Sequence, residues 1–438
     1  MSPAARAAAE AALVRSIGVR ALTASIVNTT VGAGIFVLPA AVSANIGAAA
    51  PAAFLMCAGL MALVVASYAI AGSRVSASGG PYAYAEAAFG PFVGFLAGVT
   101  LWLADALAAP ALAAALAGQV GSLVPALGTP AGRALFIAGV LGILALVNIR
   151  GVTLGIRAVE GMTLAKLTPL AVFVAVGVFF VDRSNLAWPG LPPSSALGDT
   201  VLLLIFAFVG IEVALAPSGE VKNPARTVPL SVFLALGVTT LLYMAIQFVA
   251  QGVGGPELAA NREAPLAETA AMFLGHWGRT LLLVGAGISM FGYLTGSMLA
   301  TPRTLFALAR DGVLPAAVAR VHPRFHTPHI AVMLHAALTA VIGISSTFER
   351  LAVVSNVVVL SLNLLCCAAA WRLLKRPARP GQPGGLLFPG ARLVIGAAAL
   401  GLLWVLSHAT WLEFTWLGGV LGVATALYFL RPGARRRT

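Results

Sequence analysis

The chain has 438 residues, of which 60% are hydrophobic and only 9% are charged, and its formal net charge is +13. Soluble domains usually carry about 25% charged residues, so this composition excludes a protein that exposes most of its residues to water. Apolar stretches of about 20 residues, long enough to cross a bilayer, recur along the whole chain. We therefore expect an all-α membrane protein.

The apolar stretches predict about twelve transmembrane helices. Their expected ranges, taken between polar or Pro- and Gly-rich breaks, are 18–46, 50–73, 91–120, 133–149, 158–181, 198–219, 228–251, 279–308, 328–346, 350–373, 390–409 and 411–430. An even number puts both termini on one side, and the segments on that side hold about four times as many Lys and Arg residues as the others. Since cytoplasmic loops collect basic residues, we expect a multi-pass protein of the inner (plasma) membrane with both termini in the cytoplasm.

The positive charge could instead indicate nucleic-acid binding. The basic residues are scattered over many short loops and form no groove lined with aromatic residues, so we expect no nucleic-acid partner. The three cysteines lie in apolar segments without metal-binding spacing, and the histidines between 322 and 329 are spaced loosely within one loop. We therefore expect no metal site.

Two of the predicted helices are interrupted by glycines near the middle of the membrane. Residues 31–36 in the first read VGAGIF and are followed by Pro39, and residues 206–212 in the sixth read FAFVGIE and lead to Pro217. Small residues in membrane helices often serve only to pack against a neighbouring helix, which would explain one isolated pair of glycines. Here the two breaks occupy corresponding positions of two five-helix halves, a pattern typical of inverted-repeat transporters.

The expected organisation is a cytoplasmic tail (1–16), two inverted five-helix repeats (17–181 and 198–373) with discontinuous helices 1 and 6, two C-terminal helices (390–430) and a basic tail (431–438). Two such breaks suit an amino acid. The N–H groups and the positive dipole end of a half-helix bind a carboxylate. The carbonyl groups at the end of the other half-helix accept hydrogen bonds from an ammonium group.

Three ionisable residues fall at membrane depth: Asp105 in the third helix, Lys166 in the fifth and Glu212 in the sixth. A charge there costs at least ~2.5–3.5 kcal/mol, so it is rarely tolerated without a use or a partner. Each of the three could simply tie helices together through hydrogen bonds. Burial also favours the neutral form of a lysine, so Lys166 is a candidate to take up and release a proton.

Four segments carry a family resemblance. They read VGAGIFVLPA in the first span, SASGGPYAYAEAAFG after the second, FAFVGIEVALAPSGEVKNPARTVP in the sixth, and SMLATPRTLFALARDGVLP at the end of the eighth. In this order the chain resembles the amino acid–polyamine–organocation transporter superfamily over most of its length. The resemblance implies two inverted five-helix repeats, with substrate held between the broken first and sixth helices and the third, eighth and tenth.

The resemblance also implies roles for single residues. It assigns the substrate carboxylate to the backbone of residues 32–34, the amine to carbonyl groups near Phe206 and Val209, and a gate to Phe206. The implied substrate-binding set is Gly32, Ala33, Gly34, Ile35, Asp105, Phe206, Val209, Gly210, Tyr293 and Ser297. Lys166 matches a lysine of some proton-coupled members, and Glu212 matches an acidic residue beyond the break, so both are expected to serve proton coupling.

Two alternatives stay open. A permanently charged Lys166 would suit an exchanger or a uniporter. Asp105 falls where some carriers of cationic amino acids place an acidic residue, but its Ala-rich surroundings equally suit neutral substrates.

We therefore expect a secondary transporter that moves amino acids or related amines across the membrane by alternating access. Proton symport is the main hypothesis, and an amino acid/polyamine exchanger or an exporter is the alternative. No HExxH, GxSxG or aspartate-rich motif is present, so we expect no enzyme, no catalytic residue and no cofactor. A channel would need a polar-lined pore, which fits the paired breaks less well. The sequence does not specify the oligomeric state.

Overall fold

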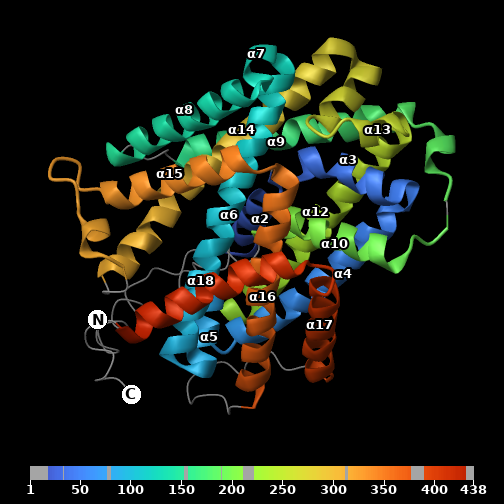
Figure 1. The fold of residues 1–438 in the computed structure, drawn as a ribbon. Coiled ribbons are helices and arrows are strands. Elements are labelled where there is room, and N and C mark those ends of the chain that lie inside the picture. The colour runs from blue at the N-terminus through green and yellow to red at the C-terminus, as the bar shows by residue number, and fades with distance from the viewer. Residues whose placement is uncertain are drawn as a thin grey trace.

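The computed structural model describes residues 18–32, 34–75, 80–151, 156–188, 190–210, 221–310, 314–375 and 389–430, and those residues form helices and connecting turns without a strand (Figure 1). The longer helices are α2 (Val19–Thr30), α3 (Gly34–Ile46), α4 (Ala50–Gly72), α5 (Pro81–Phe89), α6 (Pro91–Leu123), α8 (Pro130–Ile149), α9 (Ile156–Gly177), α10 (Ser194–Phe208), α12 (Pro224–Gly254), α14 (Pro265–Arg310), α15 (His329–Ser345), α16 (Phe348–Leu374), α17 (Ala391–Leu406) and α18 (Trp411–Leu430). Two short helices lie in connections between longer ones: α7 (Pro125–Gly128) between α6 and α8, and α13 (Glu257–Ala260) between α12 and α14.

Many of these helices are long and apolar enough to cross a bilayer. Within the described ranges, seven segments meet that condition: Gly34–Gly72, Pro91–Leu123, Pro130–Ile149, Arg226–Gly254, Pro265–Arg310, Phe348–Leu374 and Trp411–Leu430. Shorter apolar helices lie at Ala165–Phe180, Ser194–Phe208, His329–Ser345 and Ala391–Leu406. The predicted class, an α-helical multi-pass membrane protein, is confirmed, and described helices overlap each of the expected spans.

Proline sets the start of several helices. Helices α5, α6, α7, α8, α12 and α14 each begin at a proline, whose fixed φ suits the first turn and whose missing N–H would have had no partner there. Threonine caps the starts of α8 and α16. The Thr129 hydroxyl accepts a hydrogen bond from the Gly132 N–H (3.1 Å), and the Thr347 hydroxyl accepts one from the Arg350 N–H (3.4 Å).

Helix α6 lies at the centre of the packing and contacts α5, α8, α14, α15 and α16 (Figure 1). Its buried face is built mostly from alanine, including an unbroken run from Ala113 to Ala115. Lipid tails are as apolar as leucine, so membrane helices associate mainly through close packing, and small residues allow the closest approach. The alanine face explains why α6 accommodates so many neighbours.

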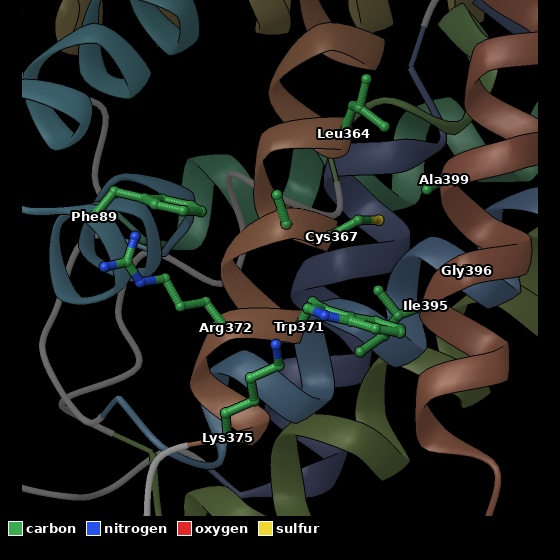
Figure 2. Close-up of a pocket in the computed structure, with 10 residues that line it drawn as sticks. Phe89, Leu364, Cys367, Trp371, Arg372, Lys375, Ile395, Gly396 and Ala399 are labelled. Carbon is green, nitrogen blue, oxygen red and sulfur yellow. The ribbon is translucent and has the colours of Figure 1, made fainter.

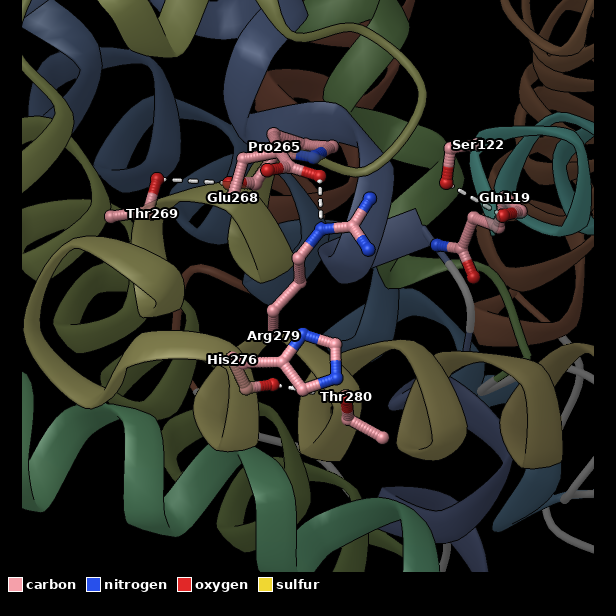
Figure 3. A network of polar contacts seen from close by, with 8 residues as sticks. All are labelled: Gln119, Ser122, Pro265, Glu268, Thr269, His276, Arg279 and Thr280. Atoms are coloured by element: carbon pink, nitrogen blue, oxygen red, sulfur yellow. Dashed lines mark hydrogen bonds and ion pairs between the residues drawn. The ribbon is translucent and has the colours of Figure 1, made fainter. Parts of the chain in front are cut away.

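Helix α14 is bent near its beginning. Gly275 has φ 64° and ψ −155°, a conformation that side-chain-bearing residues rarely adopt, and it divides α14 into a short first arm and a long second arm. An ion pair joins the two arms, because Arg279 Nε donates to Glu268 Oε1 at 2.8 Å (Figure 3). The pair links the two arms, and the second arm carries the polar residues described below.

Candidate substrate site

The first interruption lies between α2 and α3. Helix α2 ends at Thr30, Val31 leaves the helical conformation with ψ 75°, and the Gly32 N–H donates to Thr30 O at 2.7 Å. Helix α3 then begins at Gly34, and its first turn, including Ile35, is buried. The first N–H groups of a helix lack intrahelical partners, so α3 presents a positive dipole end inside the protein. Ala33 lies outside the described residues.

The second expected interruption begins where α10 ends. This helix ends at Phe208, Val209 is extended with ψ 146°, and Gly210 has φ 117°. The last carbonyl groups of a helix lack intrahelical partners, so the end of α10 presents hydrogen-bond acceptors. Glu212 lies beyond this point, outside the described residues.

The two interruptions lie directly against each other. A Cβ added at Gly34 would sit 3.3 Å from Ala207 Cα and from the Phe206 ring. A Cβ added at Gly210 would sit 3.0 Å from Thr29 O. Each glycine therefore packs on the backbone of the other broken helix, so neither merely faces lipid.

Tyr243 of α12 joins the two interruptions. Its side chain is fully buried, and its hydroxyl lies 2.8 Å from Thr30 O and 2.9 Å from Ala207 O. These carbonyl groups belong to the last residue of α2 and to the last turn of α10. One hydroxyl donor thus serves carbonyl groups at both broken helices.

Lys166 of α9 contacts the same region. It is half-buried, and its Nζ donates to Asn28 O in the last turn of α2. Within the described part of the chain, no carboxylate pairs with it. The hydroxyl of Thr30, two residues further on, is buried and has no hydrogen-bond partner among the described residues. An ammonium group and an unpaired hydroxyl therefore flank the end of α2.

Asp105 lies in a cluster of hydroxyl groups between α6 and α14. Tyr293 Oη donates to Asp105 Oδ1 at 2.6 Å, and Ser297 Oγ donates to Oδ2 at 2.7 Å. The Thr301 hydroxyl also donates to Oδ2. His335 Nε2 of α15 lies 3.3 Å from Ser297 Oγ, which extends the cluster to a third helix.

Helix α16 links this cluster to the interruptions through two consecutive residues. Ser355 Oγ donates to Ala104 O, the carbonyl next to Asp105, at 2.9 Å. Asn356 Nδ2 donates to Leu202 O at 2.7 Å, one turn before Phe206 on α10. The Phe206 ring packs edge-on against Phe348 of the same helix, with ring centroids 5.3 Å apart.

The structure thus brings the sequence-predicted residues into two groups. Gly34, Phe206 and Gly210 meet at the interruptions, with Gly32, Ile35 and Val209 beside them in the chain, and Asp105, Tyr293 and Ser297 form the hydroxyl cluster. Their binding roles stay predictions. Sequence reasoning did not identify Tyr243, Thr301, His335, Ser355 and Asn356. Their only signal is a polar side chain within an apolar helix.

Comparison with known proteins decides the family. The family model described as amino acid permease matches residues 17–425, nearly the whole chain. The chain belongs to the amino acid permease family. The predicted membership of the amino acid–polyamine–organocation superfamily is therefore confirmed.

The permease is similar along most of its length to transporters of Bacillus subtilis (strain 168). It is 27% identical to the branched-chain amino acid permease BcaP, over 96% of this chain and 94% of that protein. It is 30% identical to the serine/threonine exchanger SteT, over 83% and 84% of the two chains. It is 28% identical to the methylthioribose transporter, over 95% and 93%.

The contact between the interruptions predicts that alanine at position 34 or 210 reduces transport. Gly34→Ala and Gly210→Ala should each reduce uptake by about tenfold or more, because a Cβ separates the broken helices and, at Gly210, strains the backbone by about 1–3 kcal/mol. Uptake by cells, normalised to the amount of permease in the membrane, measures the effect. Gly287→Ala on α14 is the control, since a Cβ there meets no described atom within 4 Å. Wild-type uptake by both variants would contradict the contact.

The position of Tyr243 predicts a specific defect in Tyr243→Phe. Losing the hydroxyl removes the buried donor shared by Thr30 O and Ala207 O, and a typical hydrogen bond contributes about 0.5–1.5 kcal/mol. The melting temperature and the transport rate should both fall. Tyr68→Phe is a matched control, because the Tyr68 hydroxyl is also buried and donates to Asn363 Oδ1 (2.6 Å) away from the interruptions. That variant should lose stability but keep its transport rate per folded molecule, and equal transport by the two variants would argue against a role for Tyr243 in transport.

Proposed function

We propose that this permease is a secondary transporter that carries amino acids across the cytoplasmic membrane by alternating access, with both termini in the cytoplasm. The observation that carries the proposal is the direct contact between the ends of two interrupted helices, α2–α3 and α10. Irregular backbone is tolerated at membrane depth only where protein or a water-filled cavity surrounds it, and transporters use such breaks to bind substrate. The similarity to amino acid transporters supports the same function.

The two interruptions offer complementary polar groups to a zwitterion. The start of α3 would take the substrate carboxylate through the N–H groups of Gly34 and Ile35. The end of α10 would take the ammonium group through carbonyl groups near Phe206. The unpaired hydroxyl of Thr30 supplies a further buried polar atom that a bound substrate or water can satisfy.

Neutral amino acids are the proposed substrates. Asp105 already accepts hydrogen bonds from three hydroxyl groups, and a carboxylate offers about four acceptor positions. A cationic side chain would have to displace some of these donors. Relatives named for branched-chain amino acids and for serine and threonine agree with a neutral substrate.

Proton coupling through Lys166 is the proposed energy source. Its ammonium group donates to Asn28 O, so its protonation state bears directly on the end of α2. Loss of the proton makes this hydrogen bond a neutral one, and it thereby weakens the interaction that holds the end of α2 against α9. The alternative is amino acid exchange, as in the relative named for serine/threonine exchange, with Lys166 permanently charged.

Proteoliposomes containing the purified permease test the function. We expect uptake of radiolabelled neutral amino acids to rise when an inward proton gradient is imposed, and to rise further when unlabelled substrate is present on the opposite side. Empty liposomes and the Gly34→Ala variant are the controls. Uptake that is insensitive to substrate on the opposite side would indicate a channel, and no uptake of any amino acid would overturn the proposal.

Lys166→Gln is expected to separate coupling from binding. Glutamine keeps a donor for Asn28 O but cannot titrate, so the gain in uptake from a proton gradient should vanish while exchange of amino acids persists. Uptake measured from pH 5 to pH 8 gives the comparison. Lys222→Gln, at an exposed position before α12, controls for loss of a positive charge. Unchanged pH dependence in Lys166→Gln would exclude Lys166 as the coupling residue.

Asp105→Asn distinguishes the two substrate classes. Hydrogen bonds to a charged group contribute about 1.5–3 kcal/mol each, so the variant should transport alanine and leucine about tenfold more slowly. Arginine should remain a poor substrate for both proteins. Asp199→Asn, at an exposed position on α10, serves as the matched control. Loss of arginine transport alone would instead assign Asp105 to a cationic substrate.

A further inference from the structure

A hollow of about 600 Å³ lies along the second half of α16, with α17 on one side and Phe89 of α5 on the other (Figure 2). Its walls are apolar and include Leu364 of α16 and Ile395 and Ala399 of α17. Trp371 and Lys375 line the same hollow nearer the end of α16. The hollow is therefore amphipathic, with an apolar wall and a polar end.

Positive charge gathers at the polar end. Arg372 and Lys375 line the hollow. The Arg372 guanidinium carbon lies 5.1 Å from the centre of the Phe89 ring. The Arg392 guanidinium carbon lies 6.0 Å from the centre of the Trp371 ring. Within the described part of the chain, none of these three cations has a carboxylate partner. The sequence from 350 to 412 contains no Asp or Glu, so no acidic residue of this segment neutralises them.

The cations alone have simpler explanations. Basic residues near the last turn of a helix complement its negative dipole end, and cytoplasmic loops are rich in Lys and Arg. Neither explanation accounts for a hollow whose apolar wall continues from the cations along the two helices. An amphipathic ligand with an anionic head fits both parts at once.

Lipid can reach this side of the molecule. Leu393 and Leu400 of α17 are 79% and 70% exposed, and in a bilayer such outward-facing leucines contact acyl chains. Tryptophan is enriched at the level of the lipid headgroups, where Trp371 would then lie. A basic pocket between helices near the cytoplasmic surface is a typical site for an anionic headgroup.

We propose that this hollow along α16, between Phe89 of α5 and α17, binds one anionic phospholipid of the surrounding leaflet. Arg372 and Lys375 hold its phosphate, and one acyl chain packs along Leu364, Ile395 and Ala399. Under the proposed topology this is the cytoplasmic leaflet. The proposal requires only the membrane location of the permease and is independent of its substrate.

Trp371 provides a fluorescent reporter for the test. The purified permease is delipidated in neutral detergent and titrated with brominated phosphatidylglycerol or brominated phosphatidylcholine, whose bromine atoms quench nearby tryptophan. We expect phosphatidylglycerol to quench at about tenfold lower concentration, because two cations attract its headgroup. Trp371→Phe should remove the component that distinguishes the two lipids. Equal quenching by both lipids would overturn the proposal.

Charge variants test the headgroup contacts. Arg372→Gln/Lys375→Gln should abolish the preference for phosphatidylglycerol, whereas the exposed pair Arg320→Gln/Arg324→Gln, which removes the same charge elsewhere, should keep it. Monodispersity on gel filtration shows that each variant is folded. Soluble glycerol phosphate should compete only weakly. A preference that survives in the first variant, or that is lost equally in the second, would contradict the site, and strong competition by glycerol phosphate would assign it to a free anion.

Discussion

The architecture depends on one constraint, which is that the ends of α2 and α10 and the start of α3 are buried inside the protein and must be held against each other there. Unpaired backbone groups at membrane depth cost several kcal/mol, so both interruptions have to be enclosed by protein. Gly34 and Gly210 make the enclosure possible, since each lets the backbone of one broken helix touch that of the other. The neighbouring helices then supply polar side chains, such as those of Tyr243 and Lys166, to carbonyl groups at these helix ends.

Beyond the interruptions, buried polar groups are also satisfied by side chains of neighbouring helices. Asp105 is surrounded by hydroxyl donors from α14, and Ser355 and Asn356 on α16 tie the backbone of α6 to that of α10. A movement of α10 relative to α6 therefore has to break or carry along hydrogen bonds from α16. Such contacts would have to rearrange in the alternating access proposed above, which requires two stable packings of the same helices.

Features with a local signature could be predicted from the sequence, and features that depend on distant pairing could not. The glycines at 34 and 210 predict the interruptions from the sequence alone, because small residues in the middle of an apolar segment are recognisable without knowledge of any tertiary contact. The expected span 279–308 matches the long second arm of α14, which follows Gly275. The short first arm from Pro265 has no such signal, because Glu268 and Arg279 resemble loop residues until their pairing is visible. Tyr243 gave no signal, since its partner Thr30 lies 213 positions away.

The contact made by Tyr243 has a consequence for how an apolar protein interior can bind a cation. A phenol carries a single hydrogen, so at any instant only one of the two carbonyl oxygens of Thr30 and Ala207 receives it. The other keeps spare acceptor capacity, and rotation about one C–O bond exchanges the two without moving the main chain. Attraction for a positively charged nitrogen is thereby built into peptide oxygens, with no requirement for an acidic side chain at that spot.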